Sequence, residues 1–321
     1  MLKGIIMEQK EFKTIDEQLE ILKSRGLCFS TDESTKRYLE KENYYNIING
    51  YKDLFLETRK TSTTDEIYKD KAEFSEIKAL YEFDFELKSI ILKRILRVEN
   101  TIKAIIAYKF SQKYGHDNYM KMDNFHYKQG DAKSIKYVMD LITGVQGIIA
   151  KQVDKHESIK HYMIEYGYVP LWVLVNILPL GTISKFYSLM KQTDKQSISK
   201  EFKLTDAELV NILKNLTYCR NKCAHGERLY NFKSSAEIRA NDIHKKLSIE
   251  KENGKLAQGT KDLLSVVISL KLLLSNKDFT KMIIEINNEI FNLRKELKVI
   301  SINDVYKEMG FVENWLDISK D

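Results

Sequence analysis

The chain has 321 residues, of which 43% are hydrophobic and 31% charged, a composition typical of a globular protein and not of a disordered one. Its formal net charge of +6 permits a polyanionic partner, although a lysine-rich solvated surface explains the same excess. Only 2 prolines and 13 glycines interrupt a sequence rich in lysine, glutamate, leucine and isoleucine, so we expect an all-α fold.

Three cysteines argue against a disulfide scaffold and fit a reducing cytoplasm. Cys219 and Cys223 stand one helical turn apart, but no second pair at ligand spacing accompanies them, so we expect core residues and no metal or other cofactor. Met1 to Glu8 lacks the apolar run of a secretory signal, and the apolar stretches 171–180 and 263–274 are too short to span a bilayer. The sequence therefore predicts a soluble, cytoplasmic protein.

An N-terminal helical lobe is predicted over residues 1–70. Its first helix follows a capping box formed by Thr14 and Glu17 and ends at Gly26. A second helix is expected to begin near Asp32 and to carry Tyr45. The polar tract 58–65 is typical of a loop that closes the lobe.

The longest predicted helix extends from Glu76 to about Lys113, because apolar residues recur every three or four positions without a break. It should form the spine of a helical core predicted over residues 71–250. Another helix is expected over residues 132–151.

Two further helices of the core have recognisable starts. Pro170 is expected to open a helix that continues through Leu178, with Pro179 breaking or kinking it. Thr205 and Glu208 form a second capping box and start the next helix.

The last predicted segment, residues 251–321, is helical and packs on the core. A loop around residues 252–260 precedes a final pair of long helices and a tail that contains Phe311 and Trp315.

The helix that starts at Thr205 ends in a run that contains Arg220 and His225. A ribonuclease that works without metal needs a fixed cation for the charge on the phosphorane and an imidazole to transfer protons near neutral pH. Arg220 and His225 supply both groups, although the same pair also fits a hydrogen-bond cluster or a phosphate site without cleavage. Gly226 is typical of the position just past a helix, so His225 is expected in the last turn or at its cap.

Helix geometry limits what one copy of this motif can do. Asn221 and His225 share a helix face, so a hydrogen bond from Asn221 would orient the imidazole. Arg220 lies about 140° from His225 around the axis. The two side chains therefore converge only if the helix unwinds before Gly226 or if a second chain brings its own motif.

The pattern Arg220-Asn221-x-x-Ala224-His225 resembles the signature of HEPN ribonucleases and, within them, the Abi-like (AbiD/AbiF) abortive-infection family. Further segments that resemble this family follow in the family's order and extend over essentially the whole chain: Phe12–Gly26, Tyr38–Tyr51, Leu80–Leu87, Arg97–Glu99, Tyr108–Gly115, Pro170–Val173, Leu180–Tyr187 and Met309–Trp315.

The chain departs from the family pattern at two places. Asn49 to Lys52 stands where Ser-Gly-Tyr-Trp is more typical, and Gly226 follows His225 where a second histidine is common. The second departure leaves His225 as the motif's only imidazole.

The resemblance implies a HEPN-type helical bundle with N-terminal and C-terminal extensions, and a homodimer in which two motifs meet in one cleft. It also implies RNA cleavage by attack of the ribose 2′-OH, which leaves a 2′,3′-cyclic phosphate and a 5′-OH. Arg220, Asn221 and His225 are the expected catalytic residues. DNA lacks the nucleophile and is not an expected partner.

Other residues have two interpretations each. Glu99 is a candidate supporting residue or a helix charge pair. Arg228 and Tyr230 are candidates for contacting phosphate and stacking on a base, although Tyr230 fits the core equally well. Lys109 and Lys113 form either part of an RNA track or a solvated face.

The leading hypothesis is an abortive-infection toxin that halts growth upon phage attack by cutting RNA. Some members of the resembling family are neutralised by a small noncoding RNA, which is the expected antitoxin. The alternative is a non-catalytic RNA-binding HEPN scaffold whose motif shapes a dimer interface. A third interpretation is a target subunit that is controlled by covalent modification of Tyr230, next to the motif.

Overall fold

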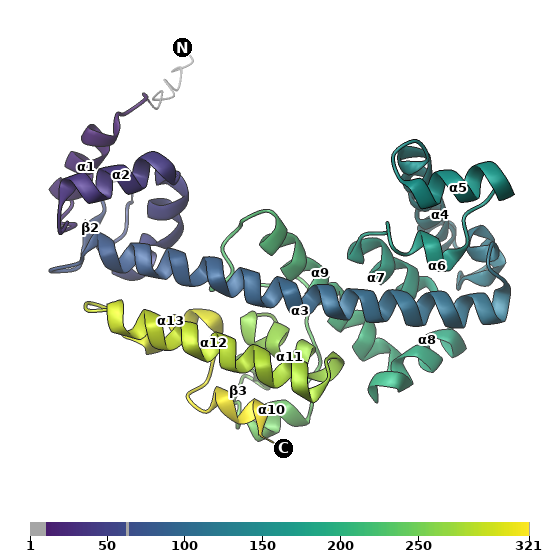
Figure 1. Cartoon of the computed structure of the whole chain (residues 1–321). Helices are drawn as coiled ribbons and strands as arrows, with labels where there is room; N and C mark the ends of the chain where they lie inside the picture. Colours follow the sequence, from purple (N-terminus) through teal and green to yellow (C-terminus); the bar gives the residue numbers. More distant parts are fainter. Residues whose placement is uncertain (1–10, 62–63, 321) are drawn as a thin grey trace, which may run out of the picture. The chain divides into compact units, whose positions relative to one another are not determined.

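The chain is an all-α protein, as its composition predicts (Figure 1). The computed structural model describes residues 11–61 and 64–320. The first ten residues, on which the prediction about a secretory signal rests, and Ser62 and Thr63 of the polar tract lie outside them. In the described part, named strands form two short antiparallel hairpins, β1 (Leu56–Thr58) with β2 (Ile67–Tyr68) and β3 (Lys251–Glu252) with β4 (Lys255–Leu256).

Two compact units divide the chain according to its internal contacts. The first comprises the chain up to Glu86 together with Asn287–Val305, and the second comprises Leu87–Ile286 together with the chain from Tyr306 onwards. The long helix α3 (Phe74–Tyr114) therefore contributes residues to both. These boundaries differ from those of the three segments expected from the sequence, and the three-part division stays a prediction.

The first helix of the first unit forms as predicted. Helix α1 (Ile15–Ser24) begins with a capping box in which Thr14 and Glu17 bond to each other's backbone N–H groups. Gly26 follows the helix with a φ of +88°.

The second helix is shorter than predicted. Helix α2 (Asp32–Lys41) ends where the backbone of Glu42 becomes extended, so Tyr45 is not part of it. Tyr45 instead begins a separate π-helical turn, η1 (Tyr45–Asn49), and a 3₁₀ turn, η2 (Lys52–Phe55), leads into the β1–β2 hairpin. Part of the predicted loop thus belongs to a strand.

Two long helices, α3 and α4, agree with the predicted ones, since both coincide with the expected helices to within two residues at each end. Helices α12 and α13 contribute residues to both units. The helices after α3 are α4 (Ala132–Gln152), α5 (Glu157–Tyr166), α6 (Leu171–Leu174), α7 (Leu180–Leu189), α8 (Gln192–Ser199), α9 (Asp206–Ala224), α10 (Asp242–Lys246), α11 (Leu263–Leu273), α12 (Asn276–Glu296) and α13 (Ile302–Met309). The 3₁₀ turns are η3 (Asn118–Met120), η4 (Met122–Asn124), η5 (Lys200–Phe202) and η6 (Trp315–Ser319).

The helix expected to extend from Pro170 through Leu178 ends early. Pro170 caps α6, which stops at Leu174, and Pro179 caps the next helix, α7. Between them, the N–H of Ile177 bonds to the carbonyl of Leu174, a tighter i to i−3 turn. Because a residue before proline disfavours the α conformation, the helix cannot continue through Leu178.

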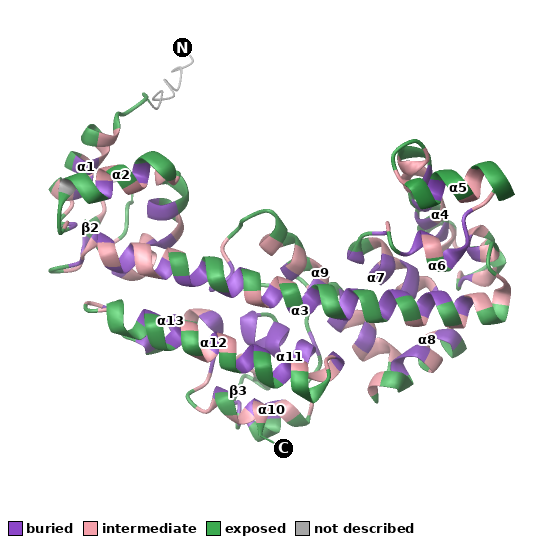
Figure 2. Ribbon diagram, in the orientation of Figure 1, coloured by how far each residue is buried: buried purple, intermediate pink, exposed green. Residues whose placement is uncertain are grey.

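Helix α9 is central to the packing of the second unit, because α7, α8 and α11 all contact it. Helix α11 is buried on every side from Leu263 to Leu270, as Figure 2 shows for its visible faces. An apolar helix without a polar face is a core helix. No helix in the described part of the chain is long and apolar enough to cross a membrane.

Candidate functional site

The candidate site lies at the C-terminal end of α9, which carries Arg220 and Asn221 and ends at His225. The helix begins with the predicted capping box of Thr205 and Glu208. Its apolar side faces the core and anchors the helix among its neighbours. The buried residues on this side include Leu209, Ile212, Leu213, Leu216 and Cys219.

His225 is the C-cap residue of α9, which confirms its predicted position. The chain leaves the helix through a Schellman arrangement, in which Glu227 N–H donates to the Lys222 carbonyl at 3.0 Å and Gly226 N–H to the Cys223 carbonyl at 3.4 Å. Gly226 has a φ of +69°, a left-handed conformation that favours glycine. The glycine after His225 is therefore required by the way the helix ends.

The side chains of Asn221 and His225 are both exposed at this helix end. The backbone N–H of His225 still donates to the carbonyl of Asn221 at 3.0 Å, so helical hydrogen bonding continues up to the cap. Helix α9 stays regular through Ala224. The local unwinding that would let Arg220 and His225 of one chain converge is not present.

Arg220 is partly buried on the last turns of α9. Its Nε atom is buried and has no hydrogen-bond partner among the described residues. Buried N–H groups of folded proteins nearly always have an acceptor, so an unpaired one points to a ligand or to a functional constraint. An anion such as a phosphate supplies the acceptor that this guanidinium lacks.

A charge pair beside His225 was missed from the sequence. The Lys222 ammonium donates to the Glu227 carboxylate at 2.9 Å. This hydrogen bond, together with the charges of Lys222 and, to a smaller extent, His225, lowers the pKa of Glu227. The pair is five residues apart, outside the usual i, i+4 spacing, and it forms because the Schellman turn brings Glu227 back toward the last turn of α9.

Glu99 is buried in α3, where one carboxylate oxygen accepts from the Lys103 ammonium at 2.7 Å. The other oxygen, Oε2, is buried and has no hydrogen-bond partner within residues 11–61 and 64–320. Glu99 and Lys103 thus form a charge pair within one helix, which was the second of the two interpretations of Glu99. A supporting role in the site stays a prediction.

Lys109 and Lys113 bind the segment that follows α7. Lys109 donates to the carbonyl of Ser197 and to Glu201, each at 2.6 Å, and Lys113 donates to Asp194. The hydrogen bond to Asp194 raises the pKa of Lys113. Both ammonium groups therefore hold α3 against α8 and η5, and their predicted contact with RNA stays a prediction.

The two candidates after the motif differ in exposure. Tyr230 is 1% exposed, so it lies in the core, in agreement with the second of its two interpretations. Its ring cannot stack on a base in this arrangement. Arg228 is half-buried.

The described residues contain no group of three or more histidine, cysteine, aspartate or glutamate side chains placed to hold a metal ion. Within the described part of the chain, Cys219 and Cys223 form no disulfide, and the first is buried and the second half-buried. The buried position of Cys219 agrees with the prediction of a core residue.

A comparison with protein families identifies the chain. The family described as Abi-like protein matches residues 37–231, more than half of the 321 residues, and this range includes all of α9 and the residues that follow it. No curated protein and no solved structure matched. The chain belongs to the Abi-like protein family.

Proposed function

We propose that the chain is a HEPN-type endoribonuclease that acts as an abortive-infection toxin. Membership of the Abi-like family supports a role in abortive infection. One observation carries the nuclease proposal: the end of a single helix carries both the exposed imidazole of His225 and the buried Nε of Arg220, which has no hydrogen-bond partner in the described part of the chain.

The proposed reaction takes its nucleophile from the substrate. The 2′-oxygen of a ribose attacks the adjacent phosphorus, the bond from phosphorus to the 5′-oxygen breaks, and the products end in a 2′,3′-cyclic phosphate and a 5′-hydroxyl. One proton leaves the 2′-OH and another is delivered to the 5′-oxygen, and His225 acts as general base or general acid in these transfers. Arg220 donates hydrogen bonds to the phosphorane oxygens and stabilises their added charge.

A second copy of the chain completes the proposed site. Because α9 is helical through Ala224, Arg220 and His225 of one chain lie about 140° apart around its axis. A two-fold axis beside the end of α9 would bring the His225 of one chain next to the Arg220 of the other. We therefore infer a homodimer with a composite cleft.

Such a nuclease has to be silent in a healthy cell. The proposed inhibitor is a small noncoding RNA that occupies the cleft. The formal net charge of +6 supports binding of a polyanion, because phosphate contacts provide much of the affinity between proteins and nucleic acids.

The decisive test is cleavage of a labelled RNA by the purified protein in the presence of EDTA. We expect the wild type to leave 2′,3′-cyclic phosphate ends, and we expect Arg220→Ala and His225→Ala to be inactive. His126→Ala is the matched control, since His126 is also exposed but lies outside α9. Cleavage by the two motif variants, or complete dependence on added Mg²⁺, would contradict the proposal.

Expression in cells distinguishes the nuclease from a non-catalytic RNA-binding scaffold. A toxin arrests growth, and His225→Ala relieves the arrest. Equal growth with the wild type and the variant at matched protein levels favours the scaffold. Sequencing the RNA that copurifies with His225→Ala identifies the inhibitor.

A further inference from the structure

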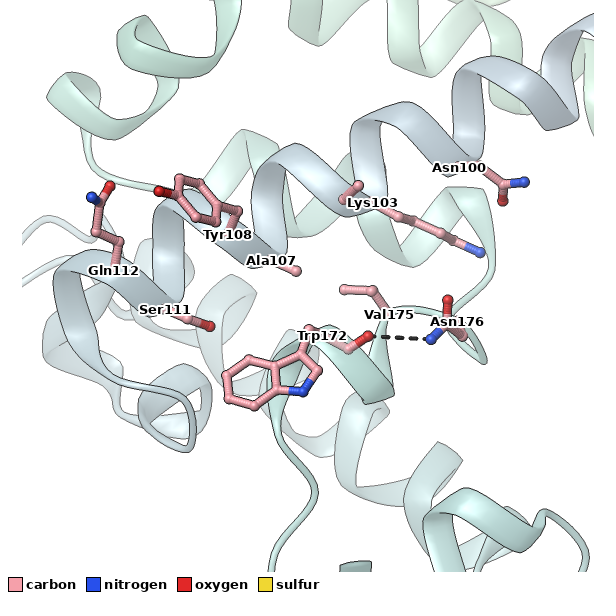
Figure 3. A pocket seen from close by; sticks show the side chains of 10 residues that line it. Asn100, Lys103, Ala107, Tyr108, Ser111, Gln112, Trp172, Val175 and Asn176 are labelled. Carbon is pink, nitrogen blue, oxygen red and sulfur yellow. Dashed lines mark hydrogen bonds between the residues drawn. The ribbon is translucent and has the colours of Figure 1, made fainter.

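A pocket of about 740 Å³ lies between α3 and the short helix α6 of the second unit. Figure 3 shows α3 along one side, with Tyr108 and Ser111, and Trp172 and Asn176 on the other side. Trp172 is 51% exposed and Tyr108 is 68% exposed, so both rings are accessible to a ligand. The volume lies within the range of small-molecule sites in proteins.

The polar groups of the pocket have unused hydrogen-bonding capacity. The Asn176 amide nitrogen donates to the carbonyls of Trp172 and Val173, each at 3.2 Å, and its carbonyl oxygen is the group left to accept. The Ser111 hydroxyl oxygen is buried without a hydrogen-bond partner in the described part of the chain. Asn100 and Gln112 add two more amides to the lining. Together these groups can accept hydrogen bonds from, and donate them to, the polar edge of a planar ring.

The described residues that line the pocket carry no unpaired charge, which favours an uncharged ring. They also include no carboxylate that would repel the phosphates attached to such a ring. Lys103 lines the pocket and is paired with Glu99 at 2.7 Å, and none of the lining residues is a carboxylate. A pocket of similar size in the first unit, about 710 Å³, is different because it has a single lysine against five glutamates. Those glutamates are Glu42, Glu82, Glu86, Glu289 and Glu296. We call it the acidic pocket.

A row of aromatic rings leads to Trp172. Neighbouring rings in this row have centroids 5.1–6.4 Å apart, and Tyr166, His116 and His161 are exposed. The row consists of His161, Tyr162, Tyr166, Tyr168, His116 and Trp172. Neighbouring ring planes are inclined by 34–78°, so each exposed ring offers its own face, and an exposed aromatic face is where a base of a single strand stacks.

We propose that the pocket binds one unstacked base of a single-stranded RNA and that the aromatic row supports the neighbouring bases. The base lies against the indole of Trp172, and its polar edge bonds to the Asn176 carbonyl and the Ser111 hydroxyl. This inference rests on the proposed function, because it takes RNA as the ligand. A proline-rich peptide also packs on aromatic rings, but it has little use for the amides and the hydroxyl that line this pocket.

Trp172 itself reports the binding. The chain has 2 tryptophans, and the other, Trp315, is 1% exposed, so quenching of fluorescence by a bound base comes from Trp172. The probe is a short 2′-O-methylated oligoadenylate, which lacks the nucleophile and is not cleaved. We expect saturable quenching with the full-length wild type and none with Trp172→Phe.

The affinity of the same strand carrying a fluorescent label tests the energetic role of the ring. Trp172→Ala is expected to weaken binding about 5- to 150-fold, the range for loss of one base stack. Phe85→Ala is the matched control, because Phe85 is 56% exposed but lines the acidic pocket, and its Kd should equal that of the wild type. Circular dichroism confirms that each variant is folded.

Further measurements show which of the two proposals, the nuclease or the base pocket, is wrong if a test fails. Saturable quenching by the wild type together with no cleavage of an unmethylated RNA would count against the nuclease and not against the pocket. An unchanged Kd for Trp172→Ala overturns the pocket. Quenching by adenosine monophosphate at the concentration at which the strand saturates, or by a polyproline peptide in place of RNA, overturns the assignment to an RNA strand.

Discussion

The Nε–H of Arg220 is buried without an acceptor among the residues that the structure describes, an arrangement that costs about 1–3 kcal/mol in a folded protein. A phosphate oxygen that accepts this hydrogen bond removes the cost, and the interaction is charge-assisted on both sides. At the scale of single residues, this nitrogen distinguishes Arg220 from a surface arginine. The sequence predicts the positive charge of Arg220. It does not predict that Nε is buried and unpaired, because this depends on how the neighbouring side chains pack, and the spacing of apolar residues does not describe that packing.

Replacing Arg220 with lysine tests this point, because lysine keeps the charge and loses the planar fork of donors. We expect Arg220→Lys to lower kcat for RNA cleavage by about 100-fold, comparable to the loss of one donor to a developing oxyanion. Initial rates with a labelled RNA measure it. Arg37→Lys, at an exposed arginine that pairs with Glu33 in α2, is the control and should keep the wild-type rate. A wild-type rate for Arg220→Lys would contradict the role of the guanidinium.

His244 is a second residue whose role depends on burial. It is 2% exposed in α10, and its ring contacts the carbonyl of Gly259 and the side chain of Asn241. Burial lowers its pKa below the ordinary 6.5, against the opposing effect of the Gly259 carbonyl. The unfolded chain therefore binds a proton more readily than the folded one near pH 6, so the contribution of His244 to stability is lost as the pH falls from 6.5 through the lowered pKa.

The expected consequence is a stability that decreases in mildly acidic solution. Between about pH 7.5 and pH 5.5, the free energy of unfolding should fall more steeply for the wild type than for His244→Gln. Denaturant titrations at each pH measure it. Asp262, whose pKa is raised by burial, contributes in the opposite direction, but it is present in both proteins. His126→Gln should follow the wild type, and parallel curves for wild type and His244→Gln would refute the prediction.

At the scale of elements, the ends of α9 were predictable, whereas the C-terminal ends of α2 and α6 were not. The Thr205 capping box and Gly226 are local signals, and both act as predicted. Tyr45, in contrast, follows α2 in a π-helical turn for which the sequence offers no pattern. The peripheral helix α5 was not foreseen, because little of its surface is buried: Ile159 is its one buried residue.

Gly226→Ala should destabilise the end of α9 without a steric clash. A left-handed alanine costs about 1 kcal/mol, and a Cβ at this position would meet nothing within 4 Å. We expect this loss in chemical denaturation, together with a lower cleavage rate, because the turn positions His225. Gly310→Ala should cost more, since its Cβ would also overlap the buried carboxylate of Asp262.

Thr205→Ala provides the control for positioning. It removes the N-terminal cap of the same helix and should also cost about 1 kcal/mol, but it acts at the opposite end from His225. Its cleavage rate should therefore stay at the wild-type value. Equal rates for the Gly226 and Thr205 variants would show that the C-terminal turn does not position the imidazole.

At the scale of the whole molecule, composition was sufficient to predict the all-α class, because few prolines and glycines interrupt good helix formers. The division into two units was not predictable, since α3 continues from one into the other without any break in its apolar pattern. The regular helical geometry at the end of α9 determines how many chains the proposed site needs. It leaves Arg220 and His225 of one chain on different sides of the helix, which is why we assign the proposed cleft to two chains.

Mixing two inactive variants tests the shared cleft. If each site uses Arg220 of one chain and His225 of the other, a heterodimer of Arg220→Ala and His225→Ala contains one intact site. Half of the dimers in an equal mixture are heterodimers, so coexpression should restore about a quarter of the wild-type rate per chain. Two affinity tags, one on each variant, isolate the heterodimer for the rate measurement. Coexpression of His225→Ala with the double variant should restore nothing, since no imidazole is then present. A tagged heterodimer that stays inactive would show that Arg220 and His225 act within one chain, and the regular helix end would then have to unwind when RNA binds.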